Sequence, residues 1–155
     1  MEFSETSQII FQLFLATLLG GLIGLEREAK RKEAGLQTYS LVTLGTCLFT
    51  IISFNLFKLF FGTAGVTYDP AGIISAITIG IGFIGAGAIF RQPSGIVGIT
   101  TAAGLWAAAA IGIAVGADFY LLAILGTFFT ILILAGLGLL EEKIFVRKKE
   151  NGDKE

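Results

Sequence analysis

The sequence of 155 residues contains no histidine, a single cysteine and two prolines, and only 15% of its residues are charged. The absence of histidine removes a common zinc ligand and the commonest general base. Cys47 alone offers neither a disulfide framework nor a metal cluster, and because it lies in an apolar run we expect it in the core. We therefore predict no catalytic residue, no metal and no cofactor, and we expect that the protein is not an enzyme.

The chain is rich in apolar residues. Hydrophobic residues make up 54% of it and the mean hydropathy is +0.83, whereas soluble domains carry about 25% charged residues. Five apolar stretches come close to the roughly 20 residues that a membrane-spanning helix needs: residues 9–25, 41–61, 71–90, 96–117 and 119–140. We predict an all-α, polytopic membrane helical bundle of about five transmembrane helices. It forms one domain over residues 1–140, with a short charged cytoplasmic tail at 141–155.

The positions of the basic residues predict how the bundle is oriented. Of the 11 Lys and Arg residues, only Lys58 lies near the end of the second stretch, and the other ten follow the first, third or fifth. By the positive-inside rule, the N-terminus is expected outside and the C-terminus in the cytoplasm. The acidic start, MEFSETSQ, differs from the basic start of a secretory signal. The first apolar stretch is therefore expected to be a retained span.

A glycine-rich segment, Gly80–Gly87, contains the pattern GxGxxG at Gly80, Gly82 and Gly85. A dinucleotide site would need a preceding strand and an acidic residue about 20 positions later, but the next acid is Asp118. No nucleotide is therefore expected, and small residues that let membrane helices approach closely explain the pattern better. Gly80 and Gly87 share one helix face and Gly82 and Gly85 the opposite one, which predicts a central helix packed against residues 96–117. Trp106 is expected to fill core space there, with substrate contact as the alternative.

Charged residues gather at the cytoplasmic end of the first span, where Glu26, Arg27 and Glu28 precede a basic run. Glu26 with Lys30, and Glu28 with Lys32, have the i,i+4 spacing of surface ion pairs. Two interpretations stay open. The segment is a solvated helix end with weak pairs, or Glu26 turns inward to face another helix, because acids at membrane depth usually serve a site.

Further polar candidates lie near the ends of the other spans. Asp69 and Pro70 have the residue types that begin a helix, so capping alone would explain them. Arg91 lies in a cytoplasmic turn over residues 91–95, and Thr100 and Thr101 are expected to form hydrogen bonds between helices. Asp118 closes a tight outer hairpin and is interpreted as a polar turn residue.

Several of these segments together resemble the membrane domain of the MgtC/SapB family, from about Leu15 to Asp118. The resemblance rests on motifs in order: GLIGLERE at 21–28, AGL at 34–36 with Thr38, LVTLGTCLFT at 41–50, DP at 69–70, GIGFIGAGAI at 80–89 and TTAAGLWAAAAIGIAVGA at 100–117. It implies a multi-pass protein of the bacterial inner membrane. It also implies a link to magnesium limitation, virulence and acid adaptation, exerted by binding other membrane proteins, including ATP synthase.

The chain departs from the family pattern at several positions near the ends of the predicted spans. It has Gln37 and Tyr39 where the family tends to read GLRTH, Gly72 in place of a frequent Arg, Val97 in place of another, and Ile79 in place of a frequent Ser. Two functions remain: a regulatory protein that binds the lipid bilayer and another membrane protein or itself, or a transporter or channel for magnesium or another small solute. No acid lies in the middle of a span, which favours the first. No nucleic acid is expected as a partner.

Overall fold

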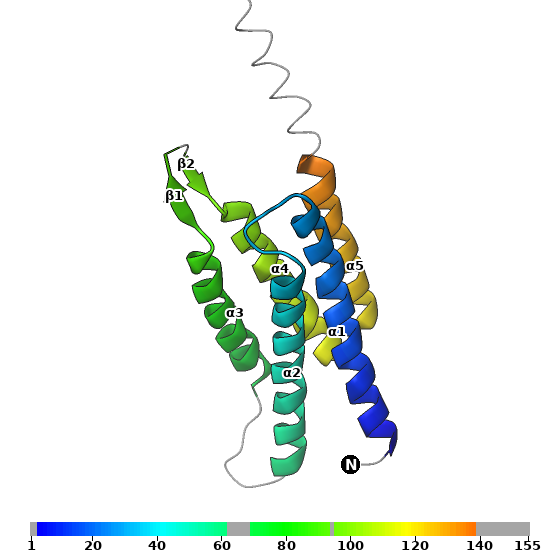
Figure 1. The fold of residues 1–155 in the computed structure, drawn as a ribbon. Helices are drawn as coiled ribbons and strands as arrows, with labels where there is room; N and C mark the ends of the chain where they lie inside the picture. The colour runs from blue at the N-terminus through cyan, green and yellow to red at the C-terminus, as the bar shows by residue number, and fades with distance from the viewer. Residues whose placement is uncertain (1–2, 62–68, 94, 139–155) are drawn as a thin grey trace, which may run out of the picture.

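The structure is a computed structural model that describes residues 3–61, 69–93 and 95–138 (Figure 1). Its helices are α1 (Phe3–Ala29), α2 (Leu36–Phe60), α3 (Pro70–Gly87), α4 (Ile99–Gly116) and α5 (Tyr120–Ile131), which continues as a short π-helix, η1 (Leu132–Leu137). An antiparallel hairpin of β1 (Phe90–Gln92) and β2 (Gly95–Val97), which the sequence did not predict, joins α3 to α4. The all-α class is confirmed over the described residues.

Four helices are long and apolar enough to cross a membrane: Glu5–Ala29, Leu36–Phe60, Ile99–Gly116 and Tyr120–Leu137. Ala71–Gly87 is a shorter apolar helix. The first two helices are longer than the predicted spans. Polar residues continue α1 to Ala29, and α2 begins at Leu36 and not at residue 41. The predicted end of the fifth span at 139–140 and the predicted tail at 141–155 lie outside the described residues. The orientation in the membrane remains a prediction.

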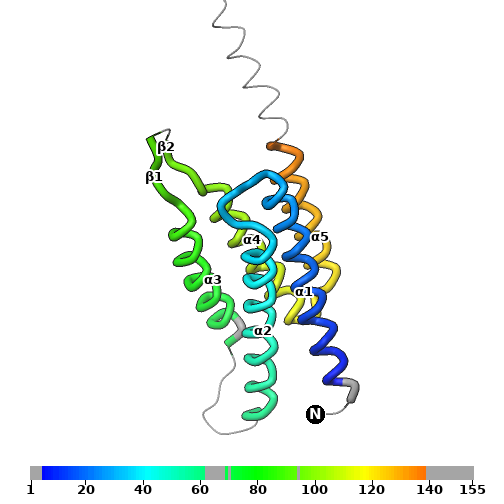
Figure 2. The backbone as a smooth tube through the Cα atoms, viewed as in Figure 1, coloured from blue at the N-terminus to red at the C-terminus, as the bar shows by residue number. Residues whose placement is uncertain are grey.

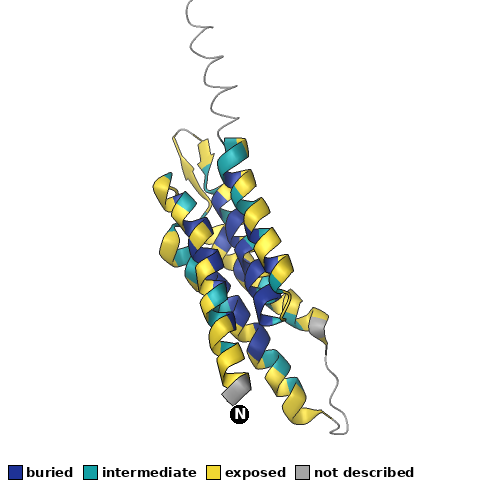
Figure 3. Cartoon of the chain, turned by 90° about the vertical axis from the view of Figure 1, so that its right-hand side faces the viewer, coloured by how far each residue is buried: buried dark blue, intermediate teal, exposed yellow. Residues whose placement is uncertain are grey.

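The core forms where α4 packs against α1, α2, α3 and α5. Glycines allow this close approach. A Cβ atom on Gly20 of α1 would lie 2.6 Å from the carbonyl oxygen of Tyr39, and one on Gly116 of α4 would lie 2.7 Å from that of Cys47. Helix α2 is thus held between glycine faces of α1 and α4. Figure 3 shows the buried residues concentrated along these contacts, and Cys47 is fully buried among them, as predicted.

The polar side chains inside this core satisfy their own hydrogen bonds. Thr43, Thr46 and Thr50 of α2 are buried, and each hydroxyl donates to the carbonyl oxygen four residues earlier, over 3.1, 3.0 and 2.8 Å. Such back-bonding lets hydroxyls enter an apolar interior without another partner. The hydroxyl hydrogens of these threonines are therefore already engaged within α2.

The prediction that α3 is a central helix was wrong. Helix α3 lies at the edge of the bundle and packs mainly against α4 (Figures 1 and 2). Only Gly85 of the four predicted packing glycines meets a neighbour, since its Cβ would lie 3.5 Å from the Cβ of Ala102. For Gly80, Gly82 and Gly87, no atom in the described ranges lies within 4 Å of that position. Helical spacing indicates which glycines share a face, but it cannot tell a covered face from an open one.

The core position predicted for Trp106 was also wrong. Its side chain is 54% exposed on the outward side of α4. The core side of α4 is occupied instead by small residues, among them Gly104, Ala108 and Gly112. A bulky indole would not fit between helices that are held together by glycine contacts, so the large side chain faces outward.

Candidate functional site

The candidate site is a cluster of polar side chains where the C-terminal end of α1 meets the N-terminal end of α4. We call it the Arg27 cluster; it consists of Glu26, Arg27, Lys30, Glu33, Tyr39 and Thr101. Arg27 is only 2% exposed, and its Nη2 donates a hydrogen bond to Thr101 Oγ1 over 3.1 Å. A buried guanidinium needs such partners, because an unpaired buried charge is strongly unfavourable. Arg27 therefore joins α1 to α4.

The side chain of Glu26 is largely buried, so this segment is not a fully solvated helix end. Its side chain is 12% exposed, Lys30 Nζ lies 2.8 Å from Oε1 and Arg27 Nη1 lies 3.7 Å from Oε2. The predicted i,i+4 pair of Glu26 with Lys30 is thus confirmed. Both carboxylate oxygens and Arg27 Nε are buried without a well-formed hydrogen bond, despite the short ion-pair distance to Lys30. The ion pair with Lys30 compensates the charge of the buried carboxylate.

Glu33 and Tyr39 complete the cluster from the α1–α2 connection and from α2. The Thr101 hydroxyl donates to Glu33 Oε2 over 2.6 Å, and the Tyr39 hydroxyl donates to the Thr101 carbonyl oxygen over 3.3 Å. The hydrogen bond from Thr101 lowers the pKa of Glu33 below its usual 4.5, and a backbone amide hydrogen bond and the charges of Lys32 and Arg27 act in the same direction. The Thr101 hydroxyl thus accepts a hydrogen bond from the Arg27 guanidinium and donates one to the Glu33 carboxylate.

Lys30 connects the cluster to the end of α5. Its Nζ donates to the carbonyl oxygen of Leu134 over 3.0 Å, while it pairs with Glu26. Leu134 lies in η1, the π-helical segment. Short π-helical segments are uncommon and often occur at functional sites. The Arg27 cluster therefore contacts four helices, and its two acidic side chains are balanced by two basic ones.

Glu28 does not form the second predicted ion pair. Its Oε2 accepts a hydrogen bond from the backbone N–H of Leu36 over 3.1 Å, and no ion pair with Lys32 occurs among the described residues. The Glu28 carboxylate thus accepts a hydrogen bond from a backbone amide at the start of α2. The N-cap residue of this helix, Gly35, has no side chain that could accept it. Glu28 shapes the connection between α1 and α2, and it lies beside the Arg27 cluster.

The remaining predicted residues are dispersed. Asp69 caps α3 by accepting from Ala71 N over 3.0 Å, with Pro70 in the first turn, as predicted. Arg91 is exposed on the hairpin opposite Ile96. Thr38 is half-buried on α2 and Thr100 is exposed, and neither side chain forms a hydrogen bond within the described part of the chain. Only Glu26, Arg27 and Thr101 of the predicted residues belong to the Arg27 cluster.

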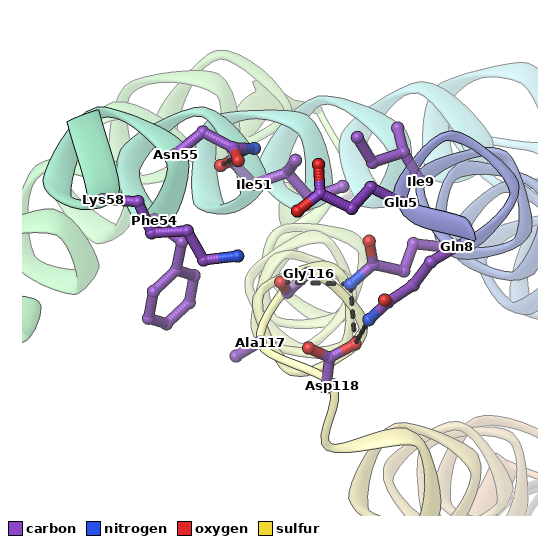
Figure 4. Close-up of a pocket in the computed structure, with 11 residues that line it drawn as sticks. Glu5, Gln8, Ile9, Ile51, Phe54, Asn55, Lys58, Gly116, Ala117 and Asp118 are labelled. Atoms are coloured by element: carbon purple, nitrogen blue, oxygen red, sulfur yellow. Dashed lines mark hydrogen bonds between the residues drawn. The ribbon is translucent and has the colours of Figure 1, made fainter. Parts of the chain in front are cut away.

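Asp118 does more than close a turn. It has a positive φ of 66°, which Asp tolerates better than most residues. Its Oδ1 accepts from Gln8 Nε2 over 2.8 Å and from Gln12 Nε2 over 3.0 Å (Figure 4). It also accepts from the Tyr120 hydroxyl over 2.5 Å. Gln12, which is 4% exposed, also donates to the carbonyl oxygens of Val115 and Gly116. Glutamine at membrane depth in the first span was the sequence signal for this contact.

No group of three or more potential metal ligands from His, Cys, Asp or Glu occurs in the described ranges. The four helices that are long and apolar enough to cross a membrane define a multi-pass α-helical membrane protein. The profile of the MgtC family matches residues 13–143. The chain belongs to the MgtC family.

The chain is also similar to several relatives that have curated descriptions. The chain is 42% identical over 129 residues to "Putative magnesium transporter YhiD" of Escherichia coli strain K12, a match that covers 83% of this chain and 60% of YhiD. It is 42% identical to SapB of Bacillus subtilis (72% of this chain, 49% of SapB) and 42% identical to MgtC of Brucella abortus (77% and 47%). The chain thus spans three-fifths or less of these three relatives. No solved structure gives a significant match.

Proposed function

We propose that this protein regulates another membrane protein by binding one of its transmembrane helices in a groove between α2 and α3. The observation that carries the proposal is the open side of α3, where no atom of the described residues lies within 4 Å of a Cβ position on Gly80. A glycine that none of the described residues packs against leaves room for a backbone from another protein. Helix association in membranes depends on such close approach.

The groove supports this interpretation in its shape and lining. It has a volume of about 460 Å³, and Thr46 and Phe49 of α2 form one wall. The other wall is α3, with Ala76 and Gly80 four residues apart, the spacing at which small residues form a helix-docking surface. The lining is completed by isoleucines: Ile73, Ile77, Ile81 and Ile84. An apolar helix with small residues at the same spacing fits this surface.

The Arg27 cluster is proposed to hold α1, α2, α4 and α5 together while α3 remains available. It has no excess charge, since Glu26 and Glu33 are matched by Arg27 and Lys30. Carboxylates that are already paired with basic side chains bind a divalent cation weakly. A role in fixing the bundle agrees better with these contacts than a role in holding magnesium.

Transport of magnesium or another small solute is the second candidate, favoured by the name of the relative YhiD. A path would have to connect the Arg27 cluster with the polar residues around Asp118. Between these two ends, Gly20 and Gly112 bring α1 and α4 against α2 at contact distance. Transport would require these helices to separate, so we place it second.

The two functions are distinguished by a groove-filling variant and a flux assay. In Gly80→Leu the added side chain fills the groove, so we expect the variant to insert normally but to fail in complementing growth in low magnesium. Phe128→Leu on exposed α5 is the control and should complement. Magnesium flux into liposomes that contain only the purified wild-type chain, at an unchanged rate in Gly80→Leu, would refute the binding function and support transport.

A further inference from the structure

A polar pocket of about 200 Å³ lies at the end of the bundle opposite to the Arg27 cluster (Figures 1 and 4). It is formed by the N-terminal turns of α1, the C-terminal part of α2 and the connection between α4 and α5. Three charged side chains line it, one from each of these segments: Glu5, Lys58 and Asp118. The proposed function makes no use of this pocket.

The charged side chains of this pocket are exposed, and the described residues leave some of their polar atoms without a partner. Glu5 and Lys58 form no ion pair or hydrogen bond with any part of the chain that the structure describes. Asp118 uses Oδ1 for three hydrogen bonds, but its Oδ2 accepts none from the described residues. Figure 4 shows the ammonium of Lys58 on one side and the carboxylates of Glu5 and Asp118 on the other. A ligand with both an anionic and a cationic group would complement this arrangement.

An apolar groove adjoins the polar pocket. It has a volume of about 390 Å³ and shares two lining residues, Phe54 and Ala117, with the pocket. Its walls are entirely apolar apart from Thr50 of α2, and they come from α2, α3, α4, α5 and the turn before α5, including Ile74, Ala110 and Leu122. A polar pocket that continues into an apolar groove has the form of a site for an amphiphile, with its headgroup in one part and its chain in the other.

We propose that this cavity binds phosphatidylethanolamine, with the headgroup in the pocket and one acyl chain in the groove. Lys58 pairs with the lipid phosphate, and Glu5 and Asp118 Oδ2 accept hydrogen bonds from the primary ammonium. The charges discriminate between lipids. The glycerol headgroup of phosphatidylglycerol has no cation for the two carboxylates, and the quaternary ammonium of phosphatidylcholine has no N–H to donate.

The proposal is tested by native mass spectrometry of the delipidated, detergent-purified full chain, titrated with each of the three lipids. One molecule of phosphatidylethanolamine should be retained at least about tenfold more tightly than either of the others. Lys58→Met should reduce this affinity about tenfold, while Lys32→Met, which removes an exposed charge at the opposite end, should not. Ala110→Phe, which fills the groove from an exposed position, should also weaken binding.

Size-exclusion profiles and circular dichroism identify any variant that fails to fold, and Glu5→Gln then replaces it as the pocket variant. Equal retention of all three lipids would overturn the proposal, as would unchanged binding in Lys58→Met and Glu5→Gln. Free phosphoethanolamine serves as a competitor. If it displaces the lipid at equal concentration and Ala110→Phe binds normally, the site takes a soluble zwitterion and the assignment to a lipid is wrong.

Discussion

Replacing Gly24 with alanine should separate α1 from the start of α2. A Cβ atom at this position would lie 2.6 Å from Leu36 Cα, 2.9 Å from the Gly35 carbonyl oxygen and 3.0 Å from Leu36 N. All three are backbone atoms, so no side-chain rotation can relieve the overlap. Ordinary contact begins at 3.4 Å, and the two helices must therefore move apart by about 0.8 Å.

The size of the effect follows from two opposing contributions. Overpacking of a close contact costs about 1–3 kcal/mol, and alanine favours the helix over glycine by about 1 kcal/mol. Gly24→Ala should therefore lower the free energy of unfolding by up to about 2 kcal/mol. The new Cβ in Gly80→Ala meets no atom of the described residues within 4 Å, so only the helix preference remains. The stability of this variant should equal or exceed that of the wild type.

The assay is reversible unfolding of the purified chain in mixed micelles, followed by circular dichroism. Gly21→Ala is the matched control on the same helix, because its Cβ would meet only the Ser40 hydroxyl oxygen, at 3.2 Å, and a leucine methyl group. It should unfold like the wild type. A loss in Gly80→Ala as large as that in Gly24→Ala would refute the placement of α3 at the edge of the bundle.

Three further predictions concern the Arg27 cluster. Arg27→Met should destabilise the protein by about 1–3 kcal/mol in the same unfolding assay, because it removes the buried donor to Thr101 and one of the two cations beside Glu26; Lys32→Met is the control, and an equal effect of both would contradict the burial argument. Glu26→Ala should insert normally but fail to complement growth in low magnesium, and full complementation would argue against a role for the cluster. Because the pKa of Glu33 is lowered on folding, its contribution to stability is present above pH 4.5 and is lost as the pH falls through the lowered value. Glu33→Gln should lose less stability than the wild type over this acid range in thermal unfolding scans, and identical acid-side losses would contradict the hydrogen bond to Thr101.

Local features of the fold could be predicted from the sequence because they depend on neighbouring residues. The pair of Glu26 with Lys30 follows from i,i+4 spacing, and the cap at Asp69 follows from its position before Pro70. The hydropathy of the long spans likewise indicated the helices, although polar residues extended α1 and α2 beyond the apolar limits. Each of these inferences needs only the chemistry of a few consecutive residues.

Contacts between distant segments could not be predicted in the same way. In a membrane protein, the lipid-facing and core-facing sides of a helix are both apolar, so periodicity does not show which side is buried. This is why α3 was expected at the centre and Trp106 in the core. The same limit hid Glu33 and Tyr39, whose partner Thr101 lies more than 60 residues away. Asp118 could be recognised as a turn residue but not as the acceptor for Gln8 and Gln12.

The proposed docking of a partner helix in the α2–α3 groove is tested most directly by site-specific photo-cross-linking in native membranes. A photoreactive amino acid at Ile77, which lines the groove, should give a discrete adduct with another protein, and the adduct should disappear when Gly80→Leu fills the groove. The same amino acid at Phe128 on the exposed side of α5 should give none. The absence of a protein adduct from Ile77, or an adduct that persists in Gly80→Leu, would contradict the account.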